Sequence, residues 1–279
     1  MHKNRTQQNI RRLCQLYGVS TSGFYAWQSR PTSQHKTYDE KLKRLIAELH
    51  QGYRRCYGAE RMHQELVQRG YSCSKRRINR LMREMGVKPS TTGLYAWRPG
   101  QHEFYSCAGN QLGKDNAMTQ TGTHWAGDFT YVKTHQGWLY HAVVLDLFHR
   151  KVIGWSFSSQ RNSELTKSAL KMALQNERPK PDCLFHSDQG IEYAAHDYRD
   201  MLVSAGMRRS MSRKSTPTDN AIVESYFHTV KAESVQRKVY ANKIEAVAEI
   251  MGFIHFYNHQ RLHSSLNFQS PINYEKLCA

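Results

Sequence analysis

Residues 124–158 have the sequence HWAGDFTYVKTHQGWLYHAVVLDLFHRKVIGWSFS, and this stretch decides the fold. Its first part alternates between aromatic and smaller or polar side chains, which is typical of a β-strand. Two short polar turns, HQG (135–137) and HRK (149–151), separate it from two further runs rich in Val, Leu and Ile. The stretch therefore predicts three consecutive strands in an antiparallel meander. The first strand is expected to carry two sets of side chains on opposite faces: Trp125, Phe129 and Tyr131 on one, and Ala126, Asp128, Thr130 and Val132 on the other.

Beyond residue 158 the pattern changes to a helical period and then alternates between short strands and helices. It predicts helices at 162–177, 196–206 and about 220–238, with short strands at 183–188 and 207–212. The order is three strands, helix, strand, helix, strand, helix. This order is typical of an α/β fold in which a mixed five-stranded sheet is flanked by helices.

Three acidic residues stand where charge would be costly in this predicted sheet. Asp128 lies within the first strand, Asp188 ends the fourth strand at a DQG turn, and Glu224 lies on the last helix of the domain. Burying a carboxylate without a partner is costly, and clustering like charges raises that cost. A divalent cation removes it, because Mg²⁺ prefers carboxylate oxygens and keeps positions for phosphate. If the first and fourth strands are adjacent, the three acids converge as catalytic metal ligands, and two ions about 3.5–4 Å apart could support in-line phosphoryl transfer.

The register of the last helix adds a cation to this predicted site. Glu224, His228 and Lys231 are spaced at i, i+4 and i+7, so they share one face of the helix. Lys231 is expected to hold a phosphate beside the metal ions. His228 could assist there, but a space-filling role is favoured.

Other acids compete for the same role. Asp146 ends the second strand and is the strongest rival, although an ion pair with Arg150 would explain it. Asp219 is better explained as a helix cap. Two more acids lie near the predicted ligands: Glu192, four residues after Asp188, and Glu233, which is on the same predicted helix as Glu224.

Charge indicates the partner. The chain of 279 residues has 40 Lys and Arg against 23 Asp and Glu, a net charge of +17 with a pI near 9.7. Such an excess favours a polyanion, DNA above all, although RNA stays open. A helix-turn-helix is predicted at 57–70 and 75–86. Its second helix carries five cations that are expected on the outward face, against either DNA or solvent: Lys75, Arg76, Arg77, Arg80 and Arg83.

Several classes of protein are disfavoured. The sequence has no run of 18 apolar residues and no secretory signal at the N-terminus, so a cytoplasmic protein without a membrane partner is expected. Its six scattered cysteines predict no disulfide framework. A histidine series could be a zinc site, but no fourth ligand has suitable spacing: His255, His259 and His263.

Composition divides the chain into five parts. Segments rich in Gly, Ser, Thr and Gln, or in Pro and polar residues, separate the periodic regions. The predicted parts are an N-terminal helical segment, a helix-turn-helix module, a linker, an α/β core and a C-terminal helical extension: 1–37, 38–88, 89–122, 123–240 and 241–279.

These motifs resemble a known family over roughly residues 10–275. The 35 residues between Asp188 and Glu224, with Lys231 seven positions further on, resemble the DDE signature of the retroviral-integrase superfamily. The text around the acids is similar to the catalytic, second-reading-frame transposase of the bacterial insertion-sequence-three family. The similar stretches are WAGDFTYVKTHQGWLYHAVVLDLFHRKVIGW, FHSDQGIEYAA, SMSRKSTPTDNAIVESYFHTVKAE and YNHQRLHSSLNFQSPINYE, while YGAERMHQEL and SKRRINRLMREMGV resemble its helix-turn-helix module.

The resemblance implies a ribonuclease-H-like core in which Asp128, Asp188 and Glu224 hold Mg²⁺ or Mn²⁺, with two ions expected. It implies that water first cuts the phosphodiester at the element end, and that the freed 3′-hydroxyl then attacks another DNA strand. The expected partners are the terminal inverted repeats of the element and the target DNA, bound by a homo-oligomer.

The family also implies a protein partner. Its members receive a terminal-repeat-binding domain and a leucine zipper from an upstream reading frame, and this chain has no sustained heptad repeat. Recognition of element ends is therefore expected from the N-terminal helices or from the upstream product, as a fusion or a partner. Two other functions stay open: a catalytically silent DNA-binding protein derived from a transposase, and a ribonuclease-H-like nuclease without strand transfer.

Overall fold

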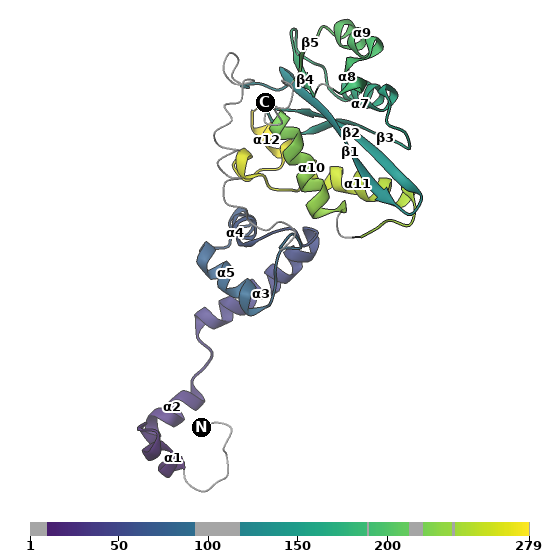
Figure 1. The fold of residues 1–279 in the computed structure, drawn as a ribbon. Coiled ribbons are helices and arrows are strands. Elements are labelled where there is room, and N and C mark those ends of the chain that lie inside the picture. The colour runs from purple at the N-terminus through teal and green to yellow at the C-terminus, as the bar shows by residue number, and fades with distance from the viewer. Residues whose placement is uncertain (1–9, 93–117, 189, 212–219, 236–237, 279) are drawn as a thin grey trace.

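The structure of the chain is a computed structural model (Figure 1). It describes residues 10–92, 118–188, 190–211, 220–235 and 238–278.

A mixed five-stranded sheet forms the centre of the C-terminal half, as the sequence predicts. Its strands are ordered β3-β2-β1-β4-β5, in which β1 pairs antiparallel with β2 and parallel with β4. The pairs β2–β3 and β4–β5 are antiparallel and parallel, respectively. The bounds are β1 His124–Thr134, β2 Gly137–Asp146, β3 Val152–Ser158, β4 Leu184–Ser187 and β5 Arg208–Met211.

Helices cover both faces of this sheet, and the alternation in β1 decides which side chains meet them. Trp125 packs with α7 and α9 on one face, whereas Ala126 and Val132 pack with α10 and α11 on the other, as predicted. Gly154 lets α7 approach β3 closely, because a Cβ there would lie 2.2 Å from the carbonyl oxygen of Ala169. The helices are α7 Ser163–Asn176, α8 Ile191–Ala194, α9 His196–Ser204, α10 Ala221–Glu233, α11 Lys243–His259 and α12 Pro271–Cys278.

The N-terminal half is helical. The predicted helix-turn-helix is present as α4 and α5, which bury their apolar faces against α3. The first helix of this module, α3, begins at Gln34, before the predicted module boundary at residue 38, because the Ser33 hydroxyl caps it by accepting from the Lys36 amide. The bounds are α1 Ile10–Leu16, α2 Thr21–Ser29, α3 Gln34–Gly52, α4 Ala59–Gln68 and α5 Lys75–Glu84.

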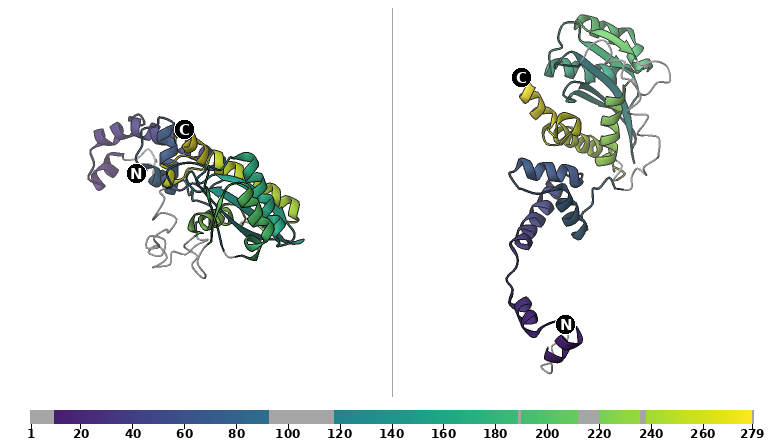
Figure 2. Two further views of the ribbon diagram at one scale, coloured as in Figure 1. Left: turned by 90° about the horizontal axis from the view of Figure 1, so that it is seen from above. Right: turned by 90° about the vertical axis from the view of Figure 1, so that its left-hand side faces the viewer.

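Figures 1 and 2 show that α1 and α2 lie away from the other helices and that an extended segment joins them to α3. None of the helices in the described part of the chain has the length and hydropathy needed to cross a membrane.

The helix-turn-helix module is fixed to the C-terminal half by direct contacts. The Tyr57 hydroxyl donates to the carbonyl of Gln260 at 3.1 Å and accepts from the amide of Leu262 at 2.9 Å. Gln68 donates to the carbonyl of Phe268 at 2.9 Å. These bonds, together with a hydrophobic core shared by α3, α4, α5, α10 and α11, hold the module in one orientation relative to the sheet.

Candidate active site

One cavity of about 660 Å³ brings together four of the predicted site residues. Asp128 enters it from β1, Asp188 from the residue after β4, and Glu224 and Lys231 from α10. His228 lines it as well, so the predicted shared face of α10 is present. The other lining residues are Phe129, Thr130, Tyr131, Tyr140, Arg161 and Phe227.

The sheet explains why the two aspartates converge. Strand β4 pairs in parallel with β1 only from His124 to Ala126, and β4 then ends while β1 continues. Asp128 and Asp188 therefore stand just beyond the point where the two strands part. Glycine at position 190 leaves room for the Asp188 carboxylate, because a Cβ there would lie 2.8 Å from the Oδ1 of Asp188, which accepts from the Gly190 amide.

The electrostatics of this cavity are unusual. Burial raises the pKa of Asp128 to about 7; the Phe129 amide partly opposes the rise, and the nearby Asp188 and Glu224 charges add to it. Burial also raises the pKa of Glu224. None of the three acids forms an ion pair with a residue that the structure describes, and the nearby Lys231 lowers the pKa of Asp128 only as a minor influence. Negative charge in the cavity is therefore poorly compensated by the protein.

The donor set suits a hard divalent cation, since it consists of carboxylate oxygens in a cavity open enough for water and phosphate. The carboxylates are not preassembled around an ion position: no three His, Cys, Asp or Glu side chains among the described residues are placed to hold a metal ion as they stand. Asp128 and Asp188 instead each accept a backbone amide, from Phe129 at 2.7 Å and from Gly190 at 2.9 Å.

Arg161 is a cavity residue that the sequence did not reveal. It forms an ion pair with the buried Glu192, and its guanidinium lies 4.9 Å from the ring centroid of Phe129. Burial raises the pKa of Glu192, but Arg161 outweighs this and the net pKa is lowered. Glu192 is thus a compensated acid. Arg161 stands in the polar segment SSQRNS (158–163), in which no local pattern marks it.

Glu233, another rival acid, is also compensated. Both of its carboxylate oxygens are bound by the Arg261 guanidinium, at 2.7 and 2.8 Å, and Arg61 lies 3.5 Å from Oε1. The pKa of Glu233 is lowered although burial alone would raise it. Asp219, the predicted helix cap, lies outside the described residues.

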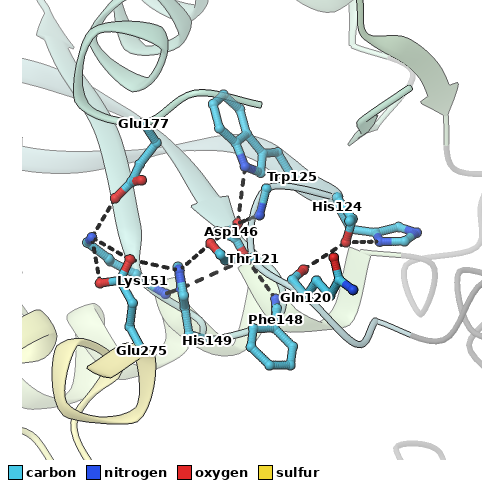
Figure 3. A network of polar contacts seen from close by, with 12 residues as sticks. Gln120, Thr121, His124, Trp125, Asp146, Phe148, His149, Lys151, Glu177 and Glu275 are labelled. Atoms are coloured by element: carbon cyan, nitrogen blue, oxygen red, sulfur yellow. Dashed lines mark hydrogen bonds and ion pairs between the residues drawn. The ribbon is translucent and has the colours of Figure 1, made fainter. Parts of the chain in front are cut away.

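Asp146 is buried in a network of its own (Figure 3). The predicted ion pair with Arg150 is wrong. Asp146 accepts instead from the Gly122 amide at 2.6 Å, the Phe148 amide at 2.9 Å and the Trp125 indole at 3.2 Å. Because β2 ends here, its terminal carboxylate can satisfy the amides of the adjoining turns, which makes Asp146 a structural acid.

The cations of α5 divide into two groups. Arg77 departs from the predicted outward placement, because it binds Asp39 of α3 at 2.7 Å and lies over the ring of Tyr38. Arg80 also binds Asp39, at 2.7 Å, and Lys75 pairs with Glu60. The remaining two are exposed and form no ion pair with a described residue: Arg76 and Arg83.

The histidine series does not form a zinc site in the described region. His255 and His259 stack on each other with ring centroids 4.1 Å apart, whereas His263 is buried and in T-shaped contact with Tyr257.

Comparisons with known proteins agree with this arrangement. Residues 118–217 and 205–271 match family models described as an integrase core domain, and residues 37–93 match one described as an HTH-like domain. The fold and its matched regions thus define an integrase core joined to a helix-turn-helix module.

Curated relatives cover nearly the whole chain. The chain is 36% identical to the insertion element IS600 uncharacterized 31 kDa protein of Shigella sonnei, over 93% of this chain and 96% of that protein. It is 34% identical to the transposase for insertion sequence element IS904 of Lactococcus lactis, over 88% and 98%. It is 31% identical to the transposase InsF for insertion sequence IS3A of Escherichia coli, over 99% and 96%. The chain therefore belongs to the family of insertion-sequence transposases that includes the IS3 enzyme.

The matches to solved structures have lower sequence identity. The catalytic core domain of HTLV-2 integrase, in its dimeric form with magnesium, has 17% identity and a TM-score of 0.45 over 56% of this chain and 97% of that one. A simian T-cell lymphotropic virus intasome has 16% identity and a TM-score of 0.46 over 56% and 55%.

Proposed function

We propose that this chain cuts DNA at the ends of its insertion sequence and joins the freed 3′-hydroxyl to another strand, using Asp128, Asp188 and Glu224 as the catalytic metal ligands. The observation that carries the proposal is the meeting of these three carboxylates, none of which forms an ion pair with a described residue, from β1, the end of β4 and α10 in one cavity of an integrase core.

Mg²⁺ or Mn²⁺ is the cofactor in this proposal, and two ions, when bound, would activate the attacking oxygen and stabilise the leaving oxygen of an in-line displacement. The residues that would hold them are the three acids. Asp128 must lose its proton to bind an ion. Because its pKa is raised to about 7, a proton and the cation compete for this carboxylate near neutral pH.

The same displacement serves both reactions. In the first, water attacks the phosphorus at the element end, the bond from phosphorus to the 3′-oxygen breaks, and that oxygen leaves as a 3′-hydroxyl. In the second, the 3′-hydroxyl attacks a phosphorus of another strand and displaces its 3′-oxygen. Lys231 lines the cavity on the same helix as Glu224, where its ammonium would hold the phosphate being attacked.

DNA binding is assigned to α5 and to the rim of the cavity. Arg76 and Arg83 are seven residues apart on one exposed face of α5 and suit phosphate contact, with Lys75 and Arg80 beside them. Arg77 is a weaker candidate, because it holds α3. The element ends, the target DNA, a homo-oligomer on DNA and the upstream-reading-frame product remain the proposed partners.

We propose to keep the division of the chain at residues 88 and 122 and to move the first boundary from residue 37 to residue 33, because α3 begins at Gln34 and runs through residue 37. The C-terminal boundary is proposed later than residue 240, because α11 packs on the sheet and Asn258 bonds to both backbone groups of Val152 on β3. An integrase core that includes α11 agrees with the family match over 205–271.

A strand-joining assay tests the function. A duplex oligonucleotide ending in the cleaved element end, incubated with Mg²⁺ and target DNA, should be joined by the wild-type chain. Asp128→Asn, Asp188→Asn and Glu224→Gln should each reduce joining by about 10³-fold or more while DNA binding persists. Asp200→Asn, which removes an exposed acid of α9, is the matched control.

Equal joining by the Glu224→Gln and wild-type proteins would refute the assignment of the third ligand. A wild-type protein that binds the end but joins nothing, even when supplied with the upstream product, would favour the catalytically silent alternative. Cutting without joining would favour a nuclease.

A further inference from the structure

A second groove opens beside the carboxylate cavity and shares two residues with it. It has a volume of about 550 Å³, and both Tyr131 and Lys231 line the two spaces. Its other lining residues are Val132, Lys133, Trp138, Val235, Lys238 and Val239. A polymer whose phosphate lies in the cavity can therefore continue directly into the groove.

Two exposed aromatic side chains form its wall. Tyr131 on β1 and Trp138 on β2 are 55% and 47% exposed, which is high for rings of this size. They touch edge to face, with centroids 5.1 Å apart and planes at 86°. A cross-strand aromatic pair stabilises a hairpin. Stabilising the hairpin does not require the two residues to be exposed, because rings covered by a helix would do the same. Here about half of each residue is exposed to solvent.

The topology explains this exposure. Beyond Ala126, β1 has left β4, and Tyr131 and Trp138 lie in the part of the β1–β2 hairpin that extends past the residues packed on α7. Along β1, the proposed metal ligand Asp128 is therefore followed three residues later by the exposed ring of Tyr131.

Cations accompany the rings. The Nζ of Lys231 lies 5.6 Å from the Tyr131 ring centroid, and Lys133 is exposed on the same strand. Lys238 is paired with Glu245 at 2.8 Å and is a weaker contributor. Exposed rings interleaved with lysines are the combination that binds single-stranded nucleic acid, since bases stack on the rings while the lysines attract phosphates.

We propose that this groove binds unpaired nucleotides of the DNA strand that enters the carboxylate cavity, with Trp138 and Tyr131 stacking on their bases. Lys133 and Lys231 face the connecting phosphates. The proposal rests on the proposed function for the position of that strand, and it adds a substrate preference: an end with unpaired nucleotides next to the cleavage position binds better than a fully paired end.

The test is a comparison of two labelled duplexes of equal paired length, one blunt and one with three unpaired nucleotides, by fluorescence anisotropy in EDTA. Wild-type protein should bind the extended duplex more tightly. Trp138→Ala should weaken that binding by about 5- to 20-fold and change blunt binding less than about twofold, whereas Trp138→Phe should retain the preference. Tyr25→Ala, which removes a similarly exposed ring on α2, is the matched control and should leave the preference intact.

A duplex whose extension carries abasic sugars separates stacking from charge. It keeps the phosphates, so it should lose the advantage of the extension if the bases stack. Quenching of tryptophan fluorescence by the extended duplex should be smaller in Trp138→Phe than in wild type, which tests the contact even where Trp138→Ala fails to fold.

Equal binding of abasic and normal extensions, or an equal loss on both duplexes in Trp138→Ala, would overturn the proposal. So would a concentration-dependent oligomer that Trp138→Ala dissolves, because a second copy of the chain would then cover the rings. Because no strand is cut in EDTA, the preference is measured independently of joining, and failure of the joining assay would leave this result standing.

Discussion

Helix α10 carries two acids with opposite surroundings. Glu224 and Glu233 are nine residues apart, which at 100° per residue places them on opposite faces of the helix. Glu224 faces the cavity, forms no ion pair with a described residue, and has a pKa raised by burial. Glu233 faces the helix-turn-helix module and the C-terminal segment, where Arg261 and Arg61 hold its pKa below the usual value although burial opposes them.

This difference distinguishes acids that stabilise the fold from acids that are available to bind a ligand. A buried carboxylate with an arginine or several amides around it has its charge satisfied by the protein itself. Glu233, Glu192 and Asp146 are of this kind. Asp128 and Glu224 are not, so their charge must be neutralised by a proton or by a cation from solution.

The largest change in stability is expected when an acid that is ion-paired within the protein is replaced. Glu233→Gln keeps the side-chain volume but leaves Arg261 buried without its counter-charge, so the free energy of unfolding should fall by about 3–5 kcal/mol. Urea denaturation measures it. Glu249→Gln is the matched control: that acid also pairs with an arginine, Arg54, but the pair is partly exposed and its loss should cost about 1 kcal/mol or less.

The pH dependence of Glu233 has a definite sign. Its folded pKa lies below the usual value near 4.5, so its stabilising contribution is present above that pH and is lost as the pH falls below it. Equal stability of the Glu233→Gln and wild-type proteins at neutral pH would show that the ion pair adds nothing to the fold.

Replacing Asp128 should instead raise the stability of the protein, by a smaller amount. Its folded pKa is about 7 against a usual 3.8, so keeping it ionised in the folded protein costs stability, and this cost grows from pH 4 to pH 7 and is complete above. In EDTA, Asp128→Asn should therefore raise Tm at pH 8, by about 2–4 °C for each ~1 kcal/mol of this cost that the substitution removes. The rise should vanish near pH 4. A lower Tm at pH 8 would mean that the carboxylate is satisfied after all.

Within the described part of the chain, the cations of α5 likewise divide into ion-paired and unpaired side chains, and the smallest change is expected for the unpaired ones, in the salt dependence of DNA binding. Arg76→Gln with Arg83→Gln should lower the slope of log binding constant against log salt by about two, since each removes a phosphate contact. Arg77→Gln should instead lower stability, because Arg77 bridges to Asp39. Filter binding at several salt concentrations measures the slope. An unchanged slope in the double variant would remove α5 from the DNA contacts.

Local patterns predicted much of this structure. The alternation in 124–134 assigned Trp125 and Ala126 to opposite faces, and the helical period assigned Glu224, His228 and Lys231 to one. Asp128 and Asp188 can converge only if β1 lies beside β4. The order of strands along the chain does not determine which strands are neighbours, and the structure confirms that these two are.

Partners distant in sequence could not be predicted. Glu224 and Glu233 look alike on their helix, and they differ only through Arg261 and Arg61, which lie 28 and 172 residues from Glu233. Arg77 meets Asp39 across 38 residues, and Arg161 meets Glu192 across 31. Each pair forms only because tertiary packing brings two helices or a loop and a helix together, which no local period encodes.

Thermal unfolding with and without a divalent cation tests the central claim most directly. Mn²⁺ binds the folded cavity and not the unfolded chain, so it should raise Tm of the wild-type protein by several degrees in a concentration-dependent manner. In Asp128→Asn and Glu224→Gln the rise should be lost, while Glu164→Gln, an exposed acid of α7, should keep it. An equal rise in all four proteins would contradict the account, because the cation would then bind somewhere other than the uncompensated carboxylates.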